Sequence, residues 1–169
     1  MKRIVITGPE STGKSWLAKH LAGHYHTVWV PEYARKYIGR LNRPYQQQDI
    51  LAIAKQQLRE EEKTAKHAHN YLFADTSLLV AKIWSDFVFG SCDPWIENKI
   101  KEHHYDLYLL CDIDLPWTFD PLREHPHARK ELLERYQSEL HNRQLPYRFV
   151  NGAGQQRLQN AVDIINNFF

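Results

Sequence analysis

The fold of this chain is decided by Ile4-Val5-Ile6-Thr7-Gly8-Pro9-Glu10-Ser11-Thr12-Gly13-Lys14-Ser15. The first three residues are apolar and β-branched, which is typical of a short buried strand. Residues 8–15 fit the pattern G-x-x-x-x-G-K-[S/T], and the residues that follow, up to His24, place apolar side chains at helical spacing. A strand, a glycine loop and a helix in this order indicate a phosphate-binding P-loop, whereas a chance match would lack that context.

The P-loop pattern predicts binding of a nucleoside triphosphate, taken as ATP, together with Mg²⁺. Its two glycines let the backbone curl so that successive N–H groups face one point, where the helix amino terminus adds positive potential. Lys14 would reach the outer phosphates, and the Ser15 hydroxyl would ligate Mg²⁺. The ATP-binding residues expected in the loop are Gly8, Glu10, Ser11, Thr12, Gly13, Lys14 and Ser15.

Further short apolar runs alternate with helical patterns along the rest of the chain. Strands are expected at residues 28–30, 71–74, 107–111 and 148–150, and helices at 15–24, 46–69, 78–89, 94–103, 128–141 and 157–169, with a turn or short helix at 32–39. Buried strands that alternate with helices predict an α/β fold. We expect a five-stranded, mostly parallel sheet with helices on both faces.

Composition limits the size and the partners of the protein. The chain has 169 residues, 43% of them hydrophobic, which suffices for one core, and we expect a single domain over residues 1–169. Its formal charge of +2 gives no broad surface for nucleic acid. The absence of a signal peptide or a long apolar span predicts a cytoplasmic protein without membrane contact. The sequence does not indicate an oligomeric state.

Two carboxylates follow predicted strands and should therefore lie at the same edge of the sheet. Asp75 comes directly after the third strand, where a carboxylate can hold Mg²⁺ through water; the alternative is a cap for the next helix. Glu32 follows the second strand and could accept a proton from a substrate hydroxyl, or it could be an ordinary surface residue. Arg35, near Glu32, could pair with it or contact phosphate.

A polar segment after the fourth strand has the composition of a mobile lid, at approximately residues 117–140. An arginine carried on a lid can stabilise the charge of the transferring phosphoryl group, and lid closure excludes water. Arg123 is the first choice for this role and Arg129 the second, although Arg129 could also be a solvated helix cation. Trp117 could stack on a flat ring of the substrate or could belong to the core.

Several of these segments together resemble the ribosylnicotinamide kinase domain of NadR-type proteins. The resemblance rests on residues 8–15, on Glu32-Tyr33-Ala34-Arg35, on Asp75-Thr76, and on Trp117 with Asp120-Pro121-Leu122-Arg123. It implies a nucleoside-kinase-like fold and transfer of the ATP γ-phosphate to the ribose 5′-hydroxyl of nicotinamide riboside. It also implies that Lys14 and Ser15 serve the triphosphate and Mg²⁺, that Glu32 and Asp75 are the active-site carboxylates, that Trp117 stacks near the nicotinamide, and that Arg123 belongs to the lid. Taken with the reasoning from the residues, we expect Lys14, Glu32, Asp75 and Arg123 to be catalytic and Ser15 and Asp75 to hold the metal. We expect Arg129 to bind ATP, and the acceptor to be bound by Glu32, Tyr33, Arg35, Trp117 and Asp120.

Two features depart from the family pattern. The chain has no room for the adenylyltransferase and DNA-binding domains of longer NadR proteins, so the kinase step alone is expected. Pro121 stands where the family often has glycine, which predicts a stiffer lid hinge because proline fixes φ. The alternatives are a kinase for another nucleoside or nucleotide, and an AAA-like, nucleotide-dependent regulatory or partner-binding module.

Overall fold

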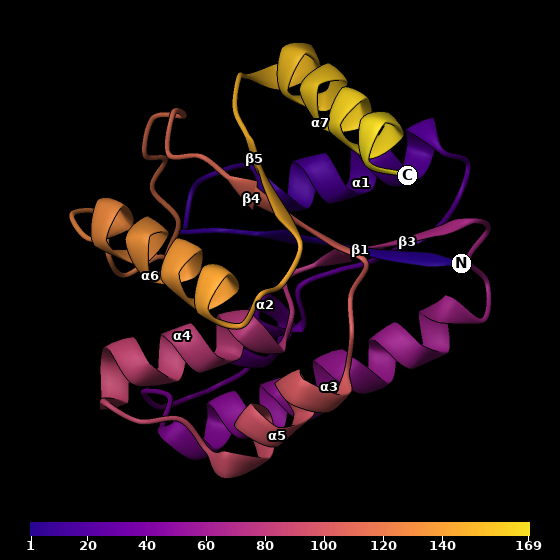
Figure 1. Cartoon of the computed structure of the whole chain (residues 1–169). Helices are drawn as coiled ribbons and strands as arrows, with labels where there is room; N and C mark the ends of the chain where they lie inside the picture. The colour runs from indigo at the N-terminus through magenta and orange to yellow at the C-terminus, as the bar shows by residue number, and fades with distance from the viewer.

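The computed structural model describes all 169 residues, and they form one parallel sheet with helices on both faces (Figure 1). The strands are β1 (Lys2–Thr7), β2 (Trp29–Val30), β3 (Tyr71–Asp75), β4 (Leu107–Cys111) and β5 (Tyr147–Val150). The helices are α1 (Lys14–His24), α2 (Tyr33–Ile38), α3 (Gln47–Ala65), α4 (Leu78–Phe89), α5 (Pro94–Glu102), α6 (Arg129–Asn142) and α7 (Gly154–Phe168). The predicted α/β fold is confirmed.

The strand order is β2-β3-β1-β4-β5, and every pairing is parallel. β3 and β4 lie on opposite sides of β1, so the chain segment that joins β3 to β4 crosses over β1. In open parallel sheets, the carboxyl edge at such a crossing is where ligands bind. The P-loop, Asp75 and the segment after β4 all start from this edge.

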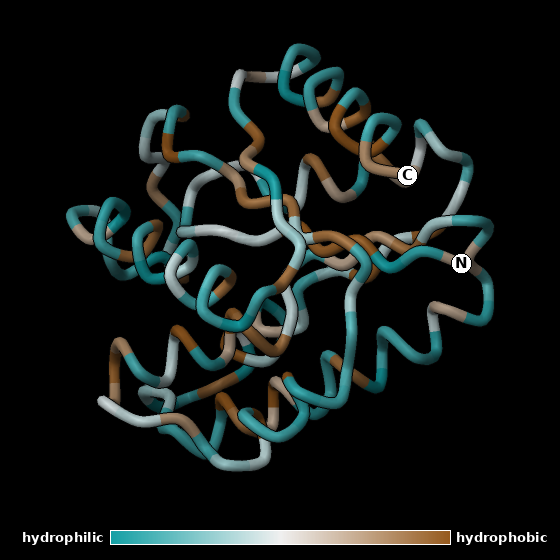
Figure 2. Tube along the Cα trace, in the orientation of Figure 1, coloured by the Kyte–Doolittle hydropathy of each residue, from teal (hydrophilic) through white to brown (hydrophobic).

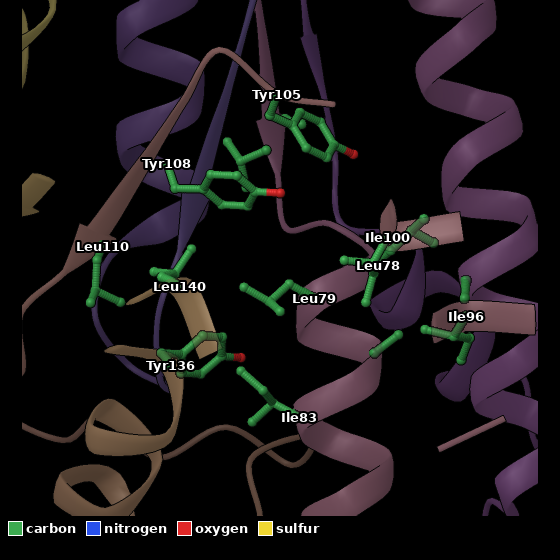
Figure 3. Close-up of a cluster of buried hydrophobic side chains, with 14 of the residues drawn as sticks. Leu78, Leu79, Ile83, Ile96, Ile100, Tyr105, Tyr108, Leu110, Tyr136 and Leu140 are labelled. Carbon is green, nitrogen blue, oxygen red and sulfur yellow. The ribbon is translucent and has the colours of Figure 1, made fainter. Parts of the chain in front are cut away.

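Alternate residues of β1 point to opposite faces, so each face has its own core. Ile4 and Ile6 belong to the cluster beneath α1 and α7, whereas Val5 belongs to the cluster covered by α3, α4, α5 and α6. Apolar colouring follows the central strands and the inner faces of the helices in Figure 2. Figure 3 shows the second cluster, in which Ile83 of α4 and Tyr136 of α6 lie near each other.

Most predicted element boundaries lie within a few residues of the observed ones, and α3 shows the largest difference. It ends at Ala65, four residues before the predicted end at residue 69. The chain has to turn there into β3, and the His69 N–H donates to the Thr27 hydroxyl at 2.9 Å instead of continuing the helix. No helix in the structure is both long enough and apolar enough to span a bilayer.

Candidate active site

The P-loop depends on glycine at two positions. Gly8 has φ of 132°, and a Cβ atom there would lie 2.9 Å from the backbone oxygen of Cys111 in the neighbouring strand. Gly13 has φ of 76° and directly precedes α1. A side chain at Gly8 would therefore clash with backbone, and both positions use a region of φ that favours glycine.

The P-loop leaves a run of backbone N–H groups without hydrogen-bond acceptors. None of the N–H groups of residues 11–15 donates to a backbone carbonyl. The Pro9 carbonyl, by contrast, accepts from the Thr12 hydroxyl at 2.8 Å and from Lys14 Nζ at 2.7 Å. Unpaired N–H groups at a helix amino terminus are the arrangement that binds phosphate oxygens.

Asp75 and Ser15 form a set of oxygen donors beside the P-loop. The Ser15 hydroxyl donates to Asp75 Oδ2 at 2.5 Å, while Asp75 Oδ1 is buried without a hydrogen-bond partner. Such oxygens fit Mg²⁺, which prefers carboxylate and hydroxyl ligands and keeps several waters. The alternative role of Asp75 as a helix cap is wrong, because Ser77 caps α4 by accepting from the Leu79 N–H at 3.3 Å.

Burial, followed by the negative charge of Glu32, raises the pKa of Asp75 from 3.8 to about 6. The carboxyl group is only 1% exposed, so its charged form is poorly solvated. Ionisation therefore destabilises the ligand-free fold, and a bound cation would relieve this.

Asp75→Asn is expected to stabilise the ligand-free protein, because Asn keeps an oxygen acceptor for Ser15 but carries no charge. Because the pKa of Asp75 is raised, its carboxyl group does not destabilise the wild type below about pH 4. As the pH rises from there through 6, the free energy of unfolding of the wild type falls by up to about 3 kcal/mol. Urea unfolding at pH 4 and pH 7.5 measures this difference. The exposed Asp163→Asn serves as control, and a variant less stable than wild type at pH 7.5 would contradict the expectation.

A cavity of about 500 Å³ opens in front of the P-loop. One part is lined by the loop from Gly8 to Ser15, together with Glu32, Arg35, Asp120 and Arg123. The rest is largely aromatic and is lined by side chains from the α2–α3 connection, α4 and α6, among them Tyr45, Trp84, Phe87 and Tyr136. Trp84 Nε1 donates to the Tyr45 hydroxyl at 3.1 Å, which fixes two of these rings relative to each other.

The segment between β4 and α6 lies against the P-loop. The Thr118 N–H donates to the Ser11 hydroxyl oxygen at 2.9 Å, and Arg123 Nη1 lies 3.3 Å from the same atom. The N–H groups of Glu124 and His125 approach one oxygen of the Glu10 carboxylate at 3.2 and 3.3 Å. Residues 118–125 are thereby held over the phosphate-binding side of the cavity.

Two further contacts join this segment to the opposite wall. Arg35 Nη1 donates to Asp120 Oδ2 at 2.7 Å, and Arg35 Nε lies 3.9 Å from Glu32. The Leu122 N–H, and then the Arg35 guanidinium, lower the pKa of Asp120. The Tyr45 hydroxyl donates to Glu124 at 2.6 Å. The Arg35–Asp120 and Tyr45–Glu124 contacts would have to break if the segment moved away from the core.

Four of the predicted site residues do not line the cavity, namely Asp75, Tyr33, Trp117 and Arg129. Asp75 is buried behind the lining residue Ser15, to which it is hydrogen-bonded. Tyr33 lies against Tyr37 with a ring-centroid separation of 6.2 Å, and its N–H is bound by Gln57. Trp117 is half-buried outside the cavity. Arg129 donates to the backbone carbonyls of Ser11 and Leu115 at 3.1 and 2.8 Å, so its guanidinium is engaged by the protein itself.

Sequence reasoning missed several residues that the structure brings to the cavity. These are Tyr45, Trp84, Phe87, His125 and Tyr136. The spacing of Trp84 and Phe87 on α4 is also that of a core-facing helix, so it gave no separate signal. His125 stands out because its Nε2 atom is buried without a hydrogen-bond partner, with its ring edge-on to Phe87 at 4.9 Å.

A family model described as an AAA domain matches residues 3–157. Among curated proteins, the trifunctional NAD biosynthesis/regulator protein NadR of Salmonella typhimurium is 29% identical over 127 residues. That match covers 73% of this chain and 31% of the relative. The chain thus spans about a third of the length of this relative.

Solved structures show the same architecture. A NadR protein in complex with NR has a TM-score of 0.83 at 19% identity, covering 99% of this chain and 51% of the other. Thymidylate kinase from Ehrlichia chaffeensis has a TM-score of 0.67 at 11% identity, covering 99% and 98%. At these identities the likeness establishes the fold, which is that of nucleoside and nucleotide kinases.

Proposed function

Because this chain belongs to the AAA domain family, with a complete nucleotide-binding P-loop, we propose that it is an ATP- and Mg²⁺-dependent kinase for nicotinamide riboside. The reaction transfers the γ-phosphate of ATP to the ribose 5′-hydroxyl and gives nicotinamide mononucleotide. The observation that carries the proposal is the single cavity that joins the P-loop to an aromatic pocket. The NadR relative supports the choice of acceptor.

The P-loop side of the cavity has the groups that hold a triphosphate. The unpaired N–H groups of residues 11–15 would bind phosphate oxygens, and Lys14 and Arg123 would offset the charge of the transferring group. Ser15 and Asp75 would hold Mg²⁺, which neutralises developing charge when it is bound. Electrostatic stabilisation of this kind supplies most of the catalysis in phosphoryl transfer.

The aromatic side suits a nucleoside with a flat base. Trp84, Tyr45 and Phe87 offer ring faces and edges on which a pyridine ring can stack. Glu32 lines the same cavity and can accept the proton of the 5′-hydroxyl, while Arg35 and Asp120 form an ion pair at the wall. We assign the acceptor to this side and transfer the stacking role from Trp117 to Trp84.

Of the segment expected to be a lid, residues 117–128 would act as one, because α6 from Arg129 onward buries Leu132, Tyr136 and Leu140 in the core. Its contacts with Glu10, Ser11, Arg35 and Tyr45 describe a closed position over the cavity. Opening would admit substrates, and closure would bring Arg123 to the phosphates and exclude water. Pro121 would limit the hinge to the residues around it, because its φ is fixed.

A substrate panel with ATP and Mg²⁺ tests the proposed function. Purified protein is incubated with nicotinamide riboside, other nucleosides and nucleoside monophosphates, and products are identified by mass spectrometry. Formation of nicotinamide mononucleotide is the expected result. Turnover of another acceptor alone would overturn the assignment of nicotinamide riboside. ATP hydrolysis without any phosphorylated acceptor, stimulated by a protein or nucleic acid, would instead indicate a regulatory module.

Trp84→Ala is expected to raise the KM for the acceptor by about 10- to 100-fold, because a ring-stacking contact is worth roughly 1–3 kcal/mol. The KM for ATP should stay unchanged, since Trp84 lies in the aromatic part of the cavity. Steady-state kinetics with each substrate varied in turn separates the two effects. Trp117→Ala is the matched control and should leave both KM values unchanged. If the acceptor KM rose in Trp117→Ala but not in Trp84→Ala, the stacking role would return to Trp117.

A further inference from the structure

Arg157, in the first turn of α7, is the largest fully buried side chain of the molecule and is 1% exposed. Arginine is almost never buried to this extent without partners, because removing its charge from water is costly. Nothing in the phosphate-transfer chemistry described above uses this residue. Its position in sequence, 145 residues after Thr12, gave no sign that it touches the P-loop.

The guanidinium of Arg157 joins three segments at the carboxyl edge of the sheet. Its Nε donates to the Gly152 carbonyl at 2.7 Å, and its Nη1 donates to the Thr12 carbonyl at 3.1 Å. Its Nη2 forms an ion pair with Asp114, whose other oxygen accepts from the Gly152 N–H at 2.6 Å. Arg157 therefore ties the P-loop to the loops that follow β4 and β5.

The bond to the Thr12 carbonyl has a direct consequence for the next N–H group. In a planar trans peptide, the C=O of one residue and the N–H of the next point in opposite directions. Arg157 does not line the cavity, whereas Gly13 does. Holding the Thr12 carbonyl toward Arg157 thus turns the Gly13 N–H toward the cavity. Glycine at position 13 would otherwise allow this peptide to rotate.

Arg129 acts on the preceding peptide in the same way. Arg129 is the first residue of α6, and its Nη1 donates to the Ser11 carbonyl at 3.1 Å. The Thr12 N–H is then directed away from Arg129. Two arginines from separate helices thus fix two successive peptides of the P-loop.

We propose that Arg157 is a positioning residue for nucleotide binding, which orients the Gly13 N–H toward the phosphates through the Thr12 carbonyl. Arg129 supports it at the Ser11 carbonyl. The proposal concerns the phosphate-binding backbone alone, so it holds for any triphosphate and does not depend on the identity of the acceptor. It predicts that loss of the Arg157 contact weakens binding of phosphates specifically.

Arg157→Lys tests the proposal, because lysine keeps the positive charge but cannot form the same forked set of bonds. The probe is inorganic triphosphate with Mg²⁺, which binds through phosphates only, and its Kd is measured by calorimetry. We expect the Kd to rise by about 10-fold or more, as for loss of a charged hydrogen bond. The Kd for ATP should rise by the same factor, with the acceptor KM unchanged.

Arg148→Lys is the matched control, since Arg148 is an exposed arginine in β5 that packs on Phe168, and its Kd values should equal those of wild type. Circular dichroism verifies folding of each variant. If Arg157→Lys does not fold, Asp114→Asn gives the second measurement, because it loosens the guanidinium while leaving Arg157 in place. Wild-type affinity for triphosphate in a folded Arg157→Lys, or in Asp114→Asn as the substitute, would overturn the proposal. Failure to phosphorylate nicotinamide riboside would leave it intact.

Discussion

Lys14→Ala should reduce phosphoryl transfer by about 10³-fold or more, the scale on which a cation at the transferring phosphate acts. Lys14 Nζ donates to the Pro9 carbonyl at 2.7 Å, and the side chain lines the cavity. It can therefore exchange one oxygen acceptor for the outer phosphates without a large movement. Its positive charge offsets charge on the phosphoryl group in the transition state, which alanine cannot do.

The measurement is product formation at saturating ATP and acceptor. Lys19→Ala provides the control, because Lys19 is an exposed lysine in the same helix, α1, and should leave turnover unchanged. Loss of the single bond to Pro9 should lower the free energy of unfolding by only about 1 kcal/mol, so Lys14→Ala should remain folded at 25 °C. Turnover in Lys14→Ala within tenfold of wild type would contradict the proposed role.

The fold could be predicted because each strand carries its own signal. Parallel strands are buried on both faces, so β4 is a continuous apolar run, and Asp106 and Asp112 mark its ends. The P-loop pattern then fixed which edge of the sheet holds the ligand. The order of the strands, with β1 in the centre, depends on long-range pairing that no local pattern records.

The site residues also divide into those that a local pattern predicts and those that depend on long-range packing. Glu32 and Asp75 follow strands that end at one edge, so their proximity to the P-loop could be expected from the sequence. Trp84 could not be found in this way, because its spacing on α4 equals that of a core residue. Tyr45 precedes α3 and reaches the cavity only through tertiary packing.

The arginines show a further limit of sequence reasoning. Charge alone does not reveal whether a guanidinium faces a ligand or a backbone carbonyl. Arg123 lines the cavity, as predicted for a lid arginine. Arg129 and Arg157 face carbonyls of the P-loop instead. The loop is thus shaped by residues that lie more than 100 positions away in the sequence.

Glu32→Gln should lower kcat by about 10²- to 10⁴-fold, the usual contribution of a general base. Glutamine has nearly the same shape, so the cavity wall and the nearby Arg35–Asp120 pair should persist. At pH 7.5, where Asp75 is ionised in both proteins, the Kd for ATP should stay unchanged, because the P-loop groups do not depend on Glu32. Single-turnover kinetics and calorimetry with ATP measure the two quantities separately.

Glu32→Gln should also change the titration of Asp75. This effect needs only the charge of Glu32, whereas the loss of transfer needs Glu32 to act as a base. The negative charge of Glu32 is the second cause, after burial, of the raised pKa of Asp75. Glu32→Gln should therefore lower the pKa of Asp75 and shift the acid limb of Mg²⁺-dependent nucleotide binding to lower pH, even as transfer is lost. Glu131→Gln, in an exposed helix pair with Arg135, should change neither property. If Glu32→Gln shifted this binding profile but kept normal turnover, Glu32 would be an electrostatic neighbour only, and the general base would have to be Asp75 or Asp120.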